Sequence, residues 1–190
     1  MMIYEVPNFL DKNSCKNLID YFNKEDTKKS NQSNHLFQNS TVSPHEMEDE
    51  KPLKIIEELK YKTTQLAVKV FPSEKFLYLD YCDVVIWDVG KEMGAHADNS
   101  YPNRESNRTP YRDYTFIIYL NHDYRGGQTY FVNENKICIP ETGKIVIFPS
   151  GLQYTHGVTK IISGTRYTLA GWLTRDKEKM FFDERILSKS

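Results

Sequence analysis

The sequence contains no apolar run close to the ~20 residues that a helix needs to cross a bilayer. Its first residues, 1–6, lack the basic and apolar regions of a secretory signal peptide. Neither sign of charge is in excess, because the formal net charge is -1 and acidic and basic residues are mixed along the chain. We therefore expect no membrane partner, and binding to nucleic acid is not favoured.

Cysteine is scarce as well. Cys15, Cys82 and Cys138 are the only three in the chain, and they are widely separated. Their number is odd and no two have the spacing of a zinc-binding pair, which argues against a disulfide framework or a zinc finger. Reduced thiols are the expected state, and a cytoplasmic location follows from them.

The chain nevertheless has ample material for one hydrophobic core. With 190 residues and 39% hydrophobic content, it is expected to form a single domain. Aromatic residues reach 13%, mostly Tyr and Phe, and this composition favours β-structure. No internal repeat is visible.

Two amphipathic helices are predicted near the start of the chain. Asp11 is a suitable N-cap for a helix over Lys12–Phe22, in which apolar residues recur at helical spacing. A second helix is predicted over 51–70, and Pro72 closes it. Residues 27–50 between the helices are polar and aperiodic, so they predict a long loop.

From residue 76 onward, short strand-like segments alternate with turn residues. Two strands are predicted over 76–81 and 83–87, before a polar loop at 99–112. The further predicted strands are 113–120, 128–132, 136–139, 144–148, 153–161 and 165–174. Strands at intervals of ~8–12 residues are typical of a sandwich or barrel, and a jelly roll fits this pattern best.

The expected fold class is therefore α+β and mainly β. Within one domain, 1–190, we expect a double-stranded β-helix (jelly roll) at 76–175, with the N-terminal helices packed on one sheet. Residues 1–75 would supply these helices and the loop between them, and 176–190 would form a charged tail.

Three residues in this frame have the chemistry of a metal site. His96 and Asp98 are two positions apart, so they project from the same side of an extended backbone. His156 follows about sixty residues later, and a jelly roll can bring such distant residues to one mouth. Two imidazoles and one carboxylate form the facial triad of non-haem Fe(II) oxygenases, which leaves coordination positions open. The same ligand types also hold zinc, so a zinc hydrolase is an alternative.

Arg166 lies ten residues beyond His156, in strand-like and otherwise apolar surroundings. A buried guanidinium is costly unless an anion pairs with it, and no dedicated carboxylate is evident nearby. A bound dicarboxylate is an attractive partner, because Arg makes bidentate contacts to carboxylates. A surface Arg on an edge strand is the alternative.

Six motifs occur in a fixed order along the chain. They are His96-x-Asp98, Tyr119-Leu120-Asn121, Gly126-Gly127-Gln128-Thr129, Gly143-Lys144-Ile145-Val146-Ile147-Phe148-Pro149, His156-Gly157-Val158 and Gly164-Thr165-Arg166-Tyr167. In this order and spacing the sequence resembles the Fe(II)/2-oxoglutarate-dependent dioxygenases, and within them the prolyl 4-hydroxylase-like group. The resemblance covers residues 79–174 and extends weakly to the first helix.

The resemblance implies a set of cofactors and their ligands. His96, Asp98 and His156 would bind Fe(II) and form the catalytic centre, while Arg166 and Tyr119 would bind the distal carboxylate of the cosubstrate 2-oxoglutarate. O2 is the second cosubstrate, and ascorbate is a candidate reductant. The chain departs from the pattern where many relatives have a Tyr, since it has Trp87 and Val89 near that position. Trp172 matches an aromatic position that lines the pocket in relatives, and core packing is an equally good account of it.

The implied reaction couples oxidative decarboxylation of 2-oxoglutarate to hydroxylation of a substrate C–H bond. A peptide or protein is the expected partner, with a prolyl residue as the first candidate and another peptidyl residue as the second. The substrate would lie under 27–50 and 99–112, where the candidate contacts are Tyr101, Arg104, Arg108 and Tyr111. Alternatives are the same chemistry on a free amino acid, another small molecule or an alkylated base, and a non-catalytic jelly-roll binding module that retains a metal. The sequence makes no prediction of the oligomeric state.

Overall fold

The structure is a computed structural model, and it describes residues 2–24, 27–31 and 39–181. Within these residues the helices are α1 (Lys12–Phe22) and α2 (Glu50–Val70), together with the short 3-10 turns η1 (Pro44–Glu46), η2 (Leu152–Tyr154) and η3 (Lys177–Lys179). None of the helices in the described part of the chain is long and apolar enough to span a bilayer.

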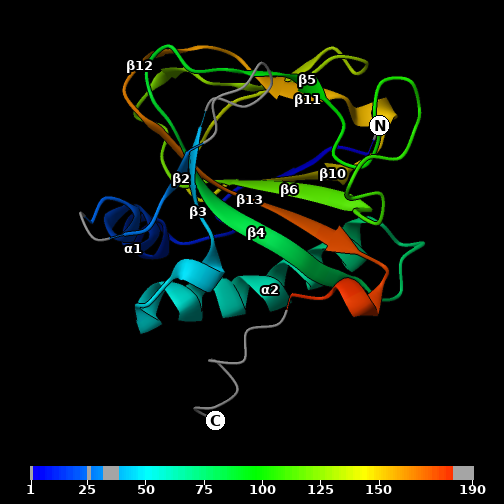
Figure 1. The fold of residues 1–190 in the computed structure, drawn as a ribbon, viewed down its shortest axis with the longest axis horizontal. Coiled ribbons are helices and arrows are strands. Elements are labelled where there is room, and N and C mark those ends of the chain that lie inside the picture. The colour runs from blue at the N-terminus through cyan, green and yellow to red at the C-terminus, as the bar shows by residue number, and fades with distance from the viewer. Residues whose placement is uncertain (1, 25–26, 32–38, 182–190) are drawn as a thin grey trace.

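The larger sheet has seven strands among the described residues. Their spatial order is β1 (Tyr4–Val6), β10 (Ile145–Pro149), β6 (Tyr114–Tyr119), β13 (Arg166–Thr174), β4 (Tyr78–Trp87), β3 (Ser40–Val42) and β2 (Ser30–Asn31). All the neighbouring pairs in this sheet are antiparallel. In Figure 1 it crosses the middle of the molecule.

A smaller sheet lies opposite the larger one (Figure 1). It contains β5 (Met93–His96), β11 (His156–Val158), β8 (Thr129–Phe131) and β9 (Lys136–Cys138), and a separate pair is formed by β12 (Ile161–Ser163) and β7 (Arg125–Gly126). Two antiparallel sheets face to face, with crossing connections, are the jelly-roll arrangement. The fold class expected from the sequence is therefore confirmed.

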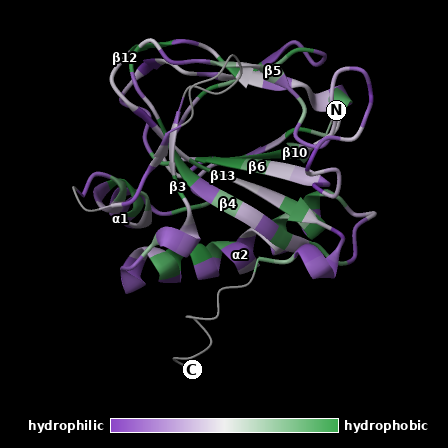
Figure 2. Ribbon diagram, in the orientation of Figure 1, coloured by the Kyte–Doolittle hydropathy of each residue, from purple (hydrophilic) through white to green (hydrophobic). Residues whose placement is uncertain are grey.

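Both helices cover the outer face of the larger sheet. The carboxylate of Asp11 accepts a hydrogen bond of 2.9 Å from the Ser14 backbone N–H, so the N-cap of α1 lies where the sequence predicts it. In α2, Ile56 and Leu59 are buried against strand residues such as Ile118. Figure 2 shows hydrophobic and hydrophilic patches alternating along α2, as expected for a helix with one buried face.

Alternation along the strands divides the side chains of the larger sheet between two environments. On β4, Cys82 and Val84 belong to the core under the helices, whereas Asp83, Val85 and Trp87 line a cavity between the sheets. Successive side chains of a strand point to opposite faces, which accounts for this separation. Because every second side chain of β4 points to the same face, only Asp83, Val85 and Trp87 of those named can reach a ligand in the cavity.

Three details differ from the sequence-based expectations, and the third is that the predicted strand 153–161 is divided among η2, β11 and the first residue of β12. Residues 27–50 are not only a loop, because they contribute β2, β3 and η1, and β3 pairs with β4 through Thr41 and Val85. Strands of two or three residues are too short to give a period, so only tertiary pairing defines them. Residues 32–38 of this segment lie outside the described part of the chain.

The second difference concerns β4, which is one strand rather than two. Nine of its ten residues pair with β13, and the register skips Asp80 between Trp172 and Leu173. Of the predicted tail, Phe181 is 3% exposed and belongs to the core under the helices. Residues 182–190 lie outside the described part of the chain.

Candidate metal centre and ligand cavity

His96 and His156 face each other across two neighbouring strands. The register of β5 and β11 pairs them directly, and their ring centroids are 4.7 Å apart. Asp98 follows β5, where its backbone N–H donates to the carbonyl of Ser150 at 3.1 Å. Its carboxylate oxygens lie 3.6 Å from Nε2 of His96 and 3.7 Å from Nε2 of His156. The three side chains are close enough to share one metal ion, since one ligand atom from each lies within 4.8 Å of the others.

Backbone carbonyls orient both imidazoles. Nδ1 of His96 is 3.1 Å from the carbonyl oxygen of Gly94, and Nδ1 of His156 is 3.1 Å from that of Tyr154. A carbonyl can only accept, so each Nδ1 carries the proton. In the neutral form of each ring, Nε2 is then an unprotonated ligand atom turned toward Asp98, which is the tautomer that a metal requires.

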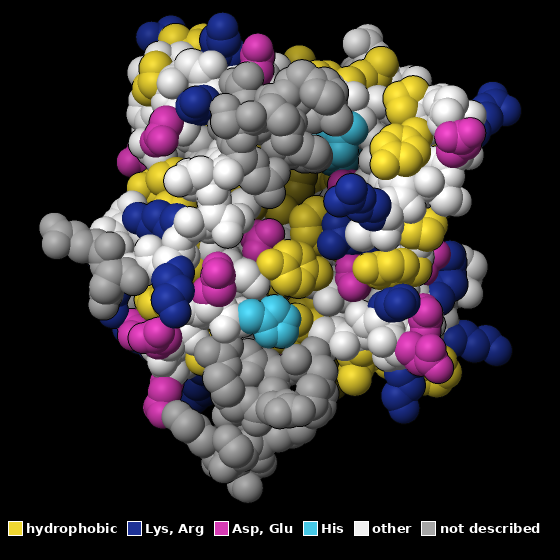
Figure 3. All heavy atoms as spheres, in the orientation of Figure 1, with side chains coloured by type: hydrophobic (Ala, Val, Ile, Leu, Met, Phe, Trp, Pro, Cys, Tyr) yellow, Lys and Arg dark blue, Asp and Glu magenta, His cyan; other side chains and the backbone are white. Residues whose placement is uncertain are grey.

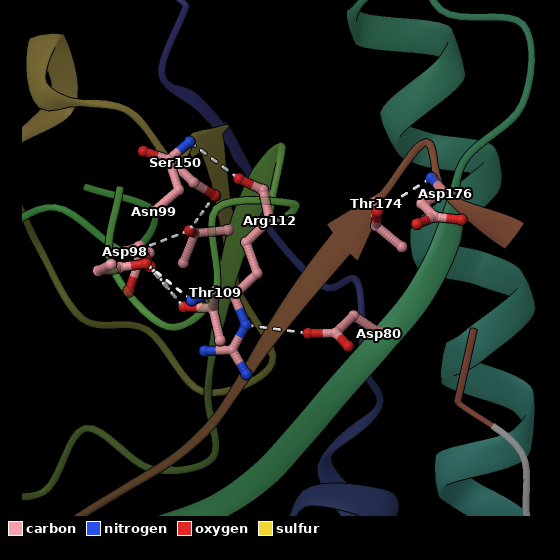
Figure 4. Close-up of polar contacts among 10 residues, drawn as sticks. Asp80, Asp98, Asn99, Thr109, Arg112, Ser150, Thr174 and Asp176 are labelled. Atoms are coloured by element: carbon pink, nitrogen blue, oxygen red, sulfur yellow. Dashed lines mark hydrogen bonds and ion pairs between the residues drawn. The ribbon is translucent and has the colours of Figure 1, made fainter. Parts of the chain in front are cut away.

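Asp98 is fixed by hydrogen bonds on three sides. Thr115 on β6 donates its hydroxyl to Oδ2 at 2.6 Å. The backbone carbonyl of Asp98 accepts from Nδ2 of Asn107 and from the hydroxyl of Thr109, each at 2.9 Å. Figure 4 shows Thr109 directed toward Asp98. The carboxylate is therefore held in place before any metal arrives.

The protonation states of His156 and Asp98 suit a divalent cation, whereas burial of His96 is more than offset by its contact with Asp98, so the pKa of His96 is raised. Burial lowers the pKa of His156 to about 4, so its ring is neutral at neutral pH. Burial by itself raises the pKa of Asp98, but the adjacent His156 and His96 and the Thr115 hydroxyl more than offset this, and the pKa lies well below its usual range. A neutral imidazole beside an ionised carboxylate is a donor set for a first-row divalent metal.

Arg166 lies on β13 and is 2% exposed, although it is charged. Its two terminal nitrogens donate to the hydroxyls of Thr168 and Thr129, each at 3.3 Å, while its Nε has no partner. No carboxylate among the described residues forms an ion pair with it. Tyr119 completes the group, because its hydroxyl donates to Thr129 at 2.9 Å and its ring centroid lies 5.6 Å from the guanidinium carbon. A buried cation without an anion is costly, so this group is suited to an anionic ligand.

One cavity of about 770 Å³ joins the metal site to Arg166. That volume lies in the range of small-ligand pockets, roughly 300–1,000 Å³. Figure 3 shows hydrophobic side chains gathered at the centre of one face of the molecule, with histidine, basic and acidic side chains around them. Five buried polar atoms that have no hydrogen-bond partner in the described structure line the cavity: Asn39 Oδ1, Asp83 Oδ1, Trp87 Nε1, Arg166 Nε and Trp172 Nε1. Buried polar groups are normally paired, so these atoms indicate ligand contacts.

Of the five site residues predicted from the sequence, His96, Asp98, His156 and Arg166 line this one cavity. Tyr119 does not line it, but it is linked to Arg166 through the Thr129 hydroxyl. Trp172 also lines the cavity. Of the residues predicted to contact substrate, Tyr101 and Arg108 line it, whereas Arg104 and Tyr111 do not.

Sequence reasoning missed Thr115, Thr129 and Thr168, which hold the carboxylate and the guanidinium. The only sequence pattern that could have identified them is that Thr115 and Thr168 alternate with core residues along their strands. It also missed Trp87 as a donor, although the register of β4 and β13 places Trp87 directly beside Arg166.

A jelly roll that carries a His-x-Asp…His triad and a buried Arg in the same cavity has the arrangement expected of the 2-oxoglutarate-dependent non-haem iron oxygenases. The sequence model of the 2OG-Fe(II) oxygenase superfamily matches residues 82–174, which contain all of these side chains. Residues 82–174 thus match this superfamily, as the motifs in the sequence indicated.

Individual relatives point in the same direction. Human prolyl 3-hydroxylase 3 is 30% identical over 142 residues, which cover 64% of this chain and 19% of the relative. The chain thus matches about a fifth of the length of its curated relatives.

The fold resembles that of the viral collagen prolyl hydroxylase from Paramecium Bursaria Chlorella virus-1, solved with 2OG. The TM-score is 0.71 at 17% identity, and the alignment covers 93% of this chain and 97% of the other. A prolyl hydroxylase from Trichoplax adhaerens, solved with a hypoxia inducible factor peptide fragment, gives a TM-score of 0.72 at 20% identity, covering 100% and 88% of the two chains.

Proposed function

We propose that this chain is a Fe(II)- and 2-oxoglutarate-dependent hydroxylase that acts on a peptidyl residue, with proline as the first candidate. The observation that carries the proposal is the coexistence of two sites in one cavity. One is the His96, Asp98 and His156 triad, and the other is the buried Arg166 without an anionic partner. A plain metal-binding module or a zinc hydrolase has no need for the second site.

His96, Asp98 and His156 would hold Fe(II) through Nε2, one carboxylate oxygen and Nε2. The carbonyls of Gly94 and Tyr154 keep both rings turned toward the metal position. Because all three ligands come from the same side, the opposite side stays open for cosubstrate and O2. When bound, the iron and 2-oxoglutarate supply the oxidising chemistry, in which decarboxylation to succinate and CO2 is coupled to hydroxylation of a C–H bond.

Arg166 would pair with the distal carboxylate of 2-oxoglutarate. The orphaned Nε is the remaining donor of the guanidinium, and the Tyr119 hydroxyl, which donates to Thr129, would turn to the same carboxylate. Trp87, in the adjacent register position, offers an unpartnered indole N–H to the same ligand. A planar guanidinium and two neutral donors suit a carboxylate better than a single lysine would.

The peptidyl substrate is supported by the relatives, since both human prolyl 3-hydroxylase 3 and the Trichoplax adhaerens enzyme are prolyl hydroxylases by name. Tyr101 and Arg108 line the cavity from the 99–112 segment, so a chain laid across the mouth would pass them. A reducing compartment such as the cytoplasm fits the three cysteines, which are all buried and free.

The test is an anaerobic titration of the full chain with Fe(II) and 2-oxoglutarate. We expect the weak visible charge-transfer band of the chelated keto acid, then succinate once O2 is admitted, and a +16 product in a proline-containing peptide library. Binding has its own readout, because a ligand at about 100 times its Kd raises the free energy of unfolding by about 2.7 kcal/mol. Mn(II) should therefore stabilise the wild-type chain and leave His96→Ala unchanged.

Each alternative gives a different result. Zn(II)-dependent hydrolysis with no response to 2-oxoglutarate would support a zinc hydrolase. Metal binding without the band and without succinate would support a non-catalytic module. A band and succinate with turnover of a free amino acid or another small molecule, and none of a peptide, would move the substrate class and keep the chemistry.

A further inference from the structure

One carboxylate in the cavity has no part in the proposed binding of the metal or of 2-oxoglutarate. Asp83 lies on β4 and lines the cavity, and its buried Oδ1 has no hydrogen-bond partner in the described structure. Ala170 is its register partner on β13, so only a methyl group stands beside it on that strand. The cavity-facing side of Asp83 is therefore an acceptor with space next to it.

The charges around Asp83 leave it without a direct counterion. The positive charge of Arg112 acts on Asp83, but the Nε of Arg112 donates to the carboxylate of Asp80 at 2.9 Å (Figure 4). Glu46 adds negative charge to the surroundings of Asp83. Arg108 also lines the cavity, but it is an exposed residue. Asp83 thus faces the cavity as the one carboxylate there, besides Asp98, that no Arg or Lys of the described residues pairs with.

Asp83 remains ionised in this environment. Burial raises its pKa to about 6, while the Tyr81 hydroxyl and the charge of Arg112 act in the opposite direction. A value of about 6 leaves the group charged at neutral pH. A partly desolvated carboxylate is best compensated by a cationic donor, because charge-assisted hydrogen bonds are the strong ones.

The position of Asp83 relative to the metal site follows from the strand register. Thr115, which binds Asp98, pairs with Trp172, and Trp172 pairs with Tyr81. With strands about 4.8 Å apart and residues about 3.3 Å apart along a strand, the Cα atoms of Thr115 and Asp83 are roughly 12 Å apart. One or two residues of extended peptide and a long side chain cover this distance.

We propose that Asp83 is a specificity-determining residue that binds a protonated nitrogen of the substrate. In a peptide this group is the ammonium or guanidinium of a Lys or Arg next to the hydroxylated residue, and in an amino acid or a free N-terminus it is the α-ammonium. The proposal rests on the proposed function, because it takes the cavity to be the substrate site. It predicts a preference for basic sequences that the iron chemistry by itself does not require.

The probe is a set of short proline-containing peptides, acetylated at the N-terminus and amidated at the C-terminus. One peptide carries Lys beside the proline, and its matched partner carries Nε-acetyl-lysine, which keeps the length and removes the charge. A third peptide has acetyl-lysine and a free N-terminus, and so separates the α-ammonium from the side chain. The two tryptophans of the chain both line the cavity, so their fluorescence reports binding directly.

We expect the full chain to bind at least one of the cationic peptides about tenfold more tightly, or better, than the blocked acetyl-lysine peptide. Asp83→Asn keeps the shape, and it should abolish this preference without changing binding of the neutral peptide. Asp88→Asn is the matched control, since Asp88 is an exposed acid just beyond the end of β4, and it should keep the preference. Equal binding of cationic and neutral peptides by the wild-type chain, absence of any peptide binding, or an unchanged preference in Asp83→Asn would each overturn the proposal.

Failure of this proposal can be told apart from failure of the proposed function. The charge-transfer band with Fe(II) and 2-oxoglutarate should be the same in wild type and Asp83→Asn, because Asp83 touches neither site. A normal band with no charge preference rejects the role of Asp83 alone. A missing band rejects the oxygenase, while the fluorescence titration still measures whether Asp83 selects cations.

Discussion

The hydroxyl of Thr115 donates a 2.6 Å hydrogen bond to Oδ2 of Asp98, the one carboxylate of the candidate metal site. The Ser150 hydroxyl lies 2.8 Å from the Thr115 hydroxyl, so the three side chains form a row of hydrogen-bonded groups that ends at the carboxylate. A group that hydrogen-bonds to a metal ligand fixes the orientation of that ligand. Removing such a group typically lowers metal affinity or activity by about 10- to 100-fold. Thr115 would therefore position a ligand of the candidate metal site without being a ligand itself.

Thr115→Val keeps the shape of the side chain and removes the donor. We expect Fe(II) or Mn(II) affinity to fall by roughly 10- to 100-fold, because Asp98 is then free to rotate. Anaerobic calorimetry measures this directly. Thr115→Ser keeps the hydroxyl and should bind metal nearly as well as the wild type. Equal affinities of the Val and wild-type chains would show that Thr115 has only a packing role.

Replacing Arg166 should weaken 2-oxoglutarate binding without lowering the free energy of unfolding. The guanidinium is 2% exposed and has no anionic partner among the described residues, so Arg166→Met removes a buried charge. We expect the free energy of unfolding without 2-oxoglutarate to stay the same or rise by about 1–4 kcal/mol. The affinity for 2-oxoglutarate should fall by about two orders of magnitude.

Urea unfolding and the charge-transfer titration give these two numbers. Arg166→Lys is the control, because it keeps the charge and loses the planar fork, and it should bind 2-oxoglutarate with intermediate affinity. If Arg166→Met bound 2-oxoglutarate normally, the cosubstrate assignment of this residue would be wrong.

Gly157 follows His156 at a close approach of two strands. A Cβ there would lie 2.5 Å from the Tyr130 hydroxyl and 2.6 Å from the carbonyl oxygen of Met93, which belongs to β5. Gly157→Ala must push β5 away from β11 and thereby separate the two histidines. We expect a loss of about 1–3 kcal/mol in the free energy of unfolding, together with weaker metal binding.

Gly151→Ala is the matched control, since the nearest atom to a Cβ there is 4.0 Å away. Thermal unfolding and Mn(II) titration of both variants test the comparison. A Gly157→Ala chain that binds Mn(II) like the wild type would show that β5 can move without disturbing the triad.

Arg175 and Glu74 connect the end of β13 to the turn after α2. Glu74 is 9% exposed and accepts from Nε of Arg175 at 2.9 Å and from the Tyr114 hydroxyl at 2.7 Å. The hydrogen bond from Arg175 is the main cause of the lowered pKa of Glu74. A lowered folded-state pKa contributes stability above the unfolded value of about 4.3, and this contribution is lost as the pH falls through the folded pKa.

Arg175→Leu should therefore reduce the free energy of unfolding by about 1–3 kcal/mol at neutral pH. The difference from wild type should shrink as the pH falls below about 4, where Glu74 becomes protonated in both chains. Urea unfolding across pH measures it, and Arg125→Leu, an exposed arginine on β7, is the control. A difference that does not change with pH would rule out the ion pair as its source.

The sequence by itself determined the helices, most of the strands and the residues of the metal centre. Apolar residues at helical spacing define α1 and α2, and two-residue spacing places His96 and Asp98 on one side of the chain. These are local patterns, and short-range sterics and hydrogen bonding generate them. The chemistry of a His, an Asp and a second His then limits the function to a metal site.

The tertiary structure decided which distant residues stand beside one another. Strand pairing sets Trp87 beside Arg166, Ala170 beside Asp83 and Thr115 beside Trp172. A shift of one residue in any register would turn these side chains to the other face, and no local pattern fixes that register between strands so far apart in sequence. Burial of both sheets against each other selects it, so the cavity, its orphaned polar atoms and the position of Asp83 became visible only in the folded chain.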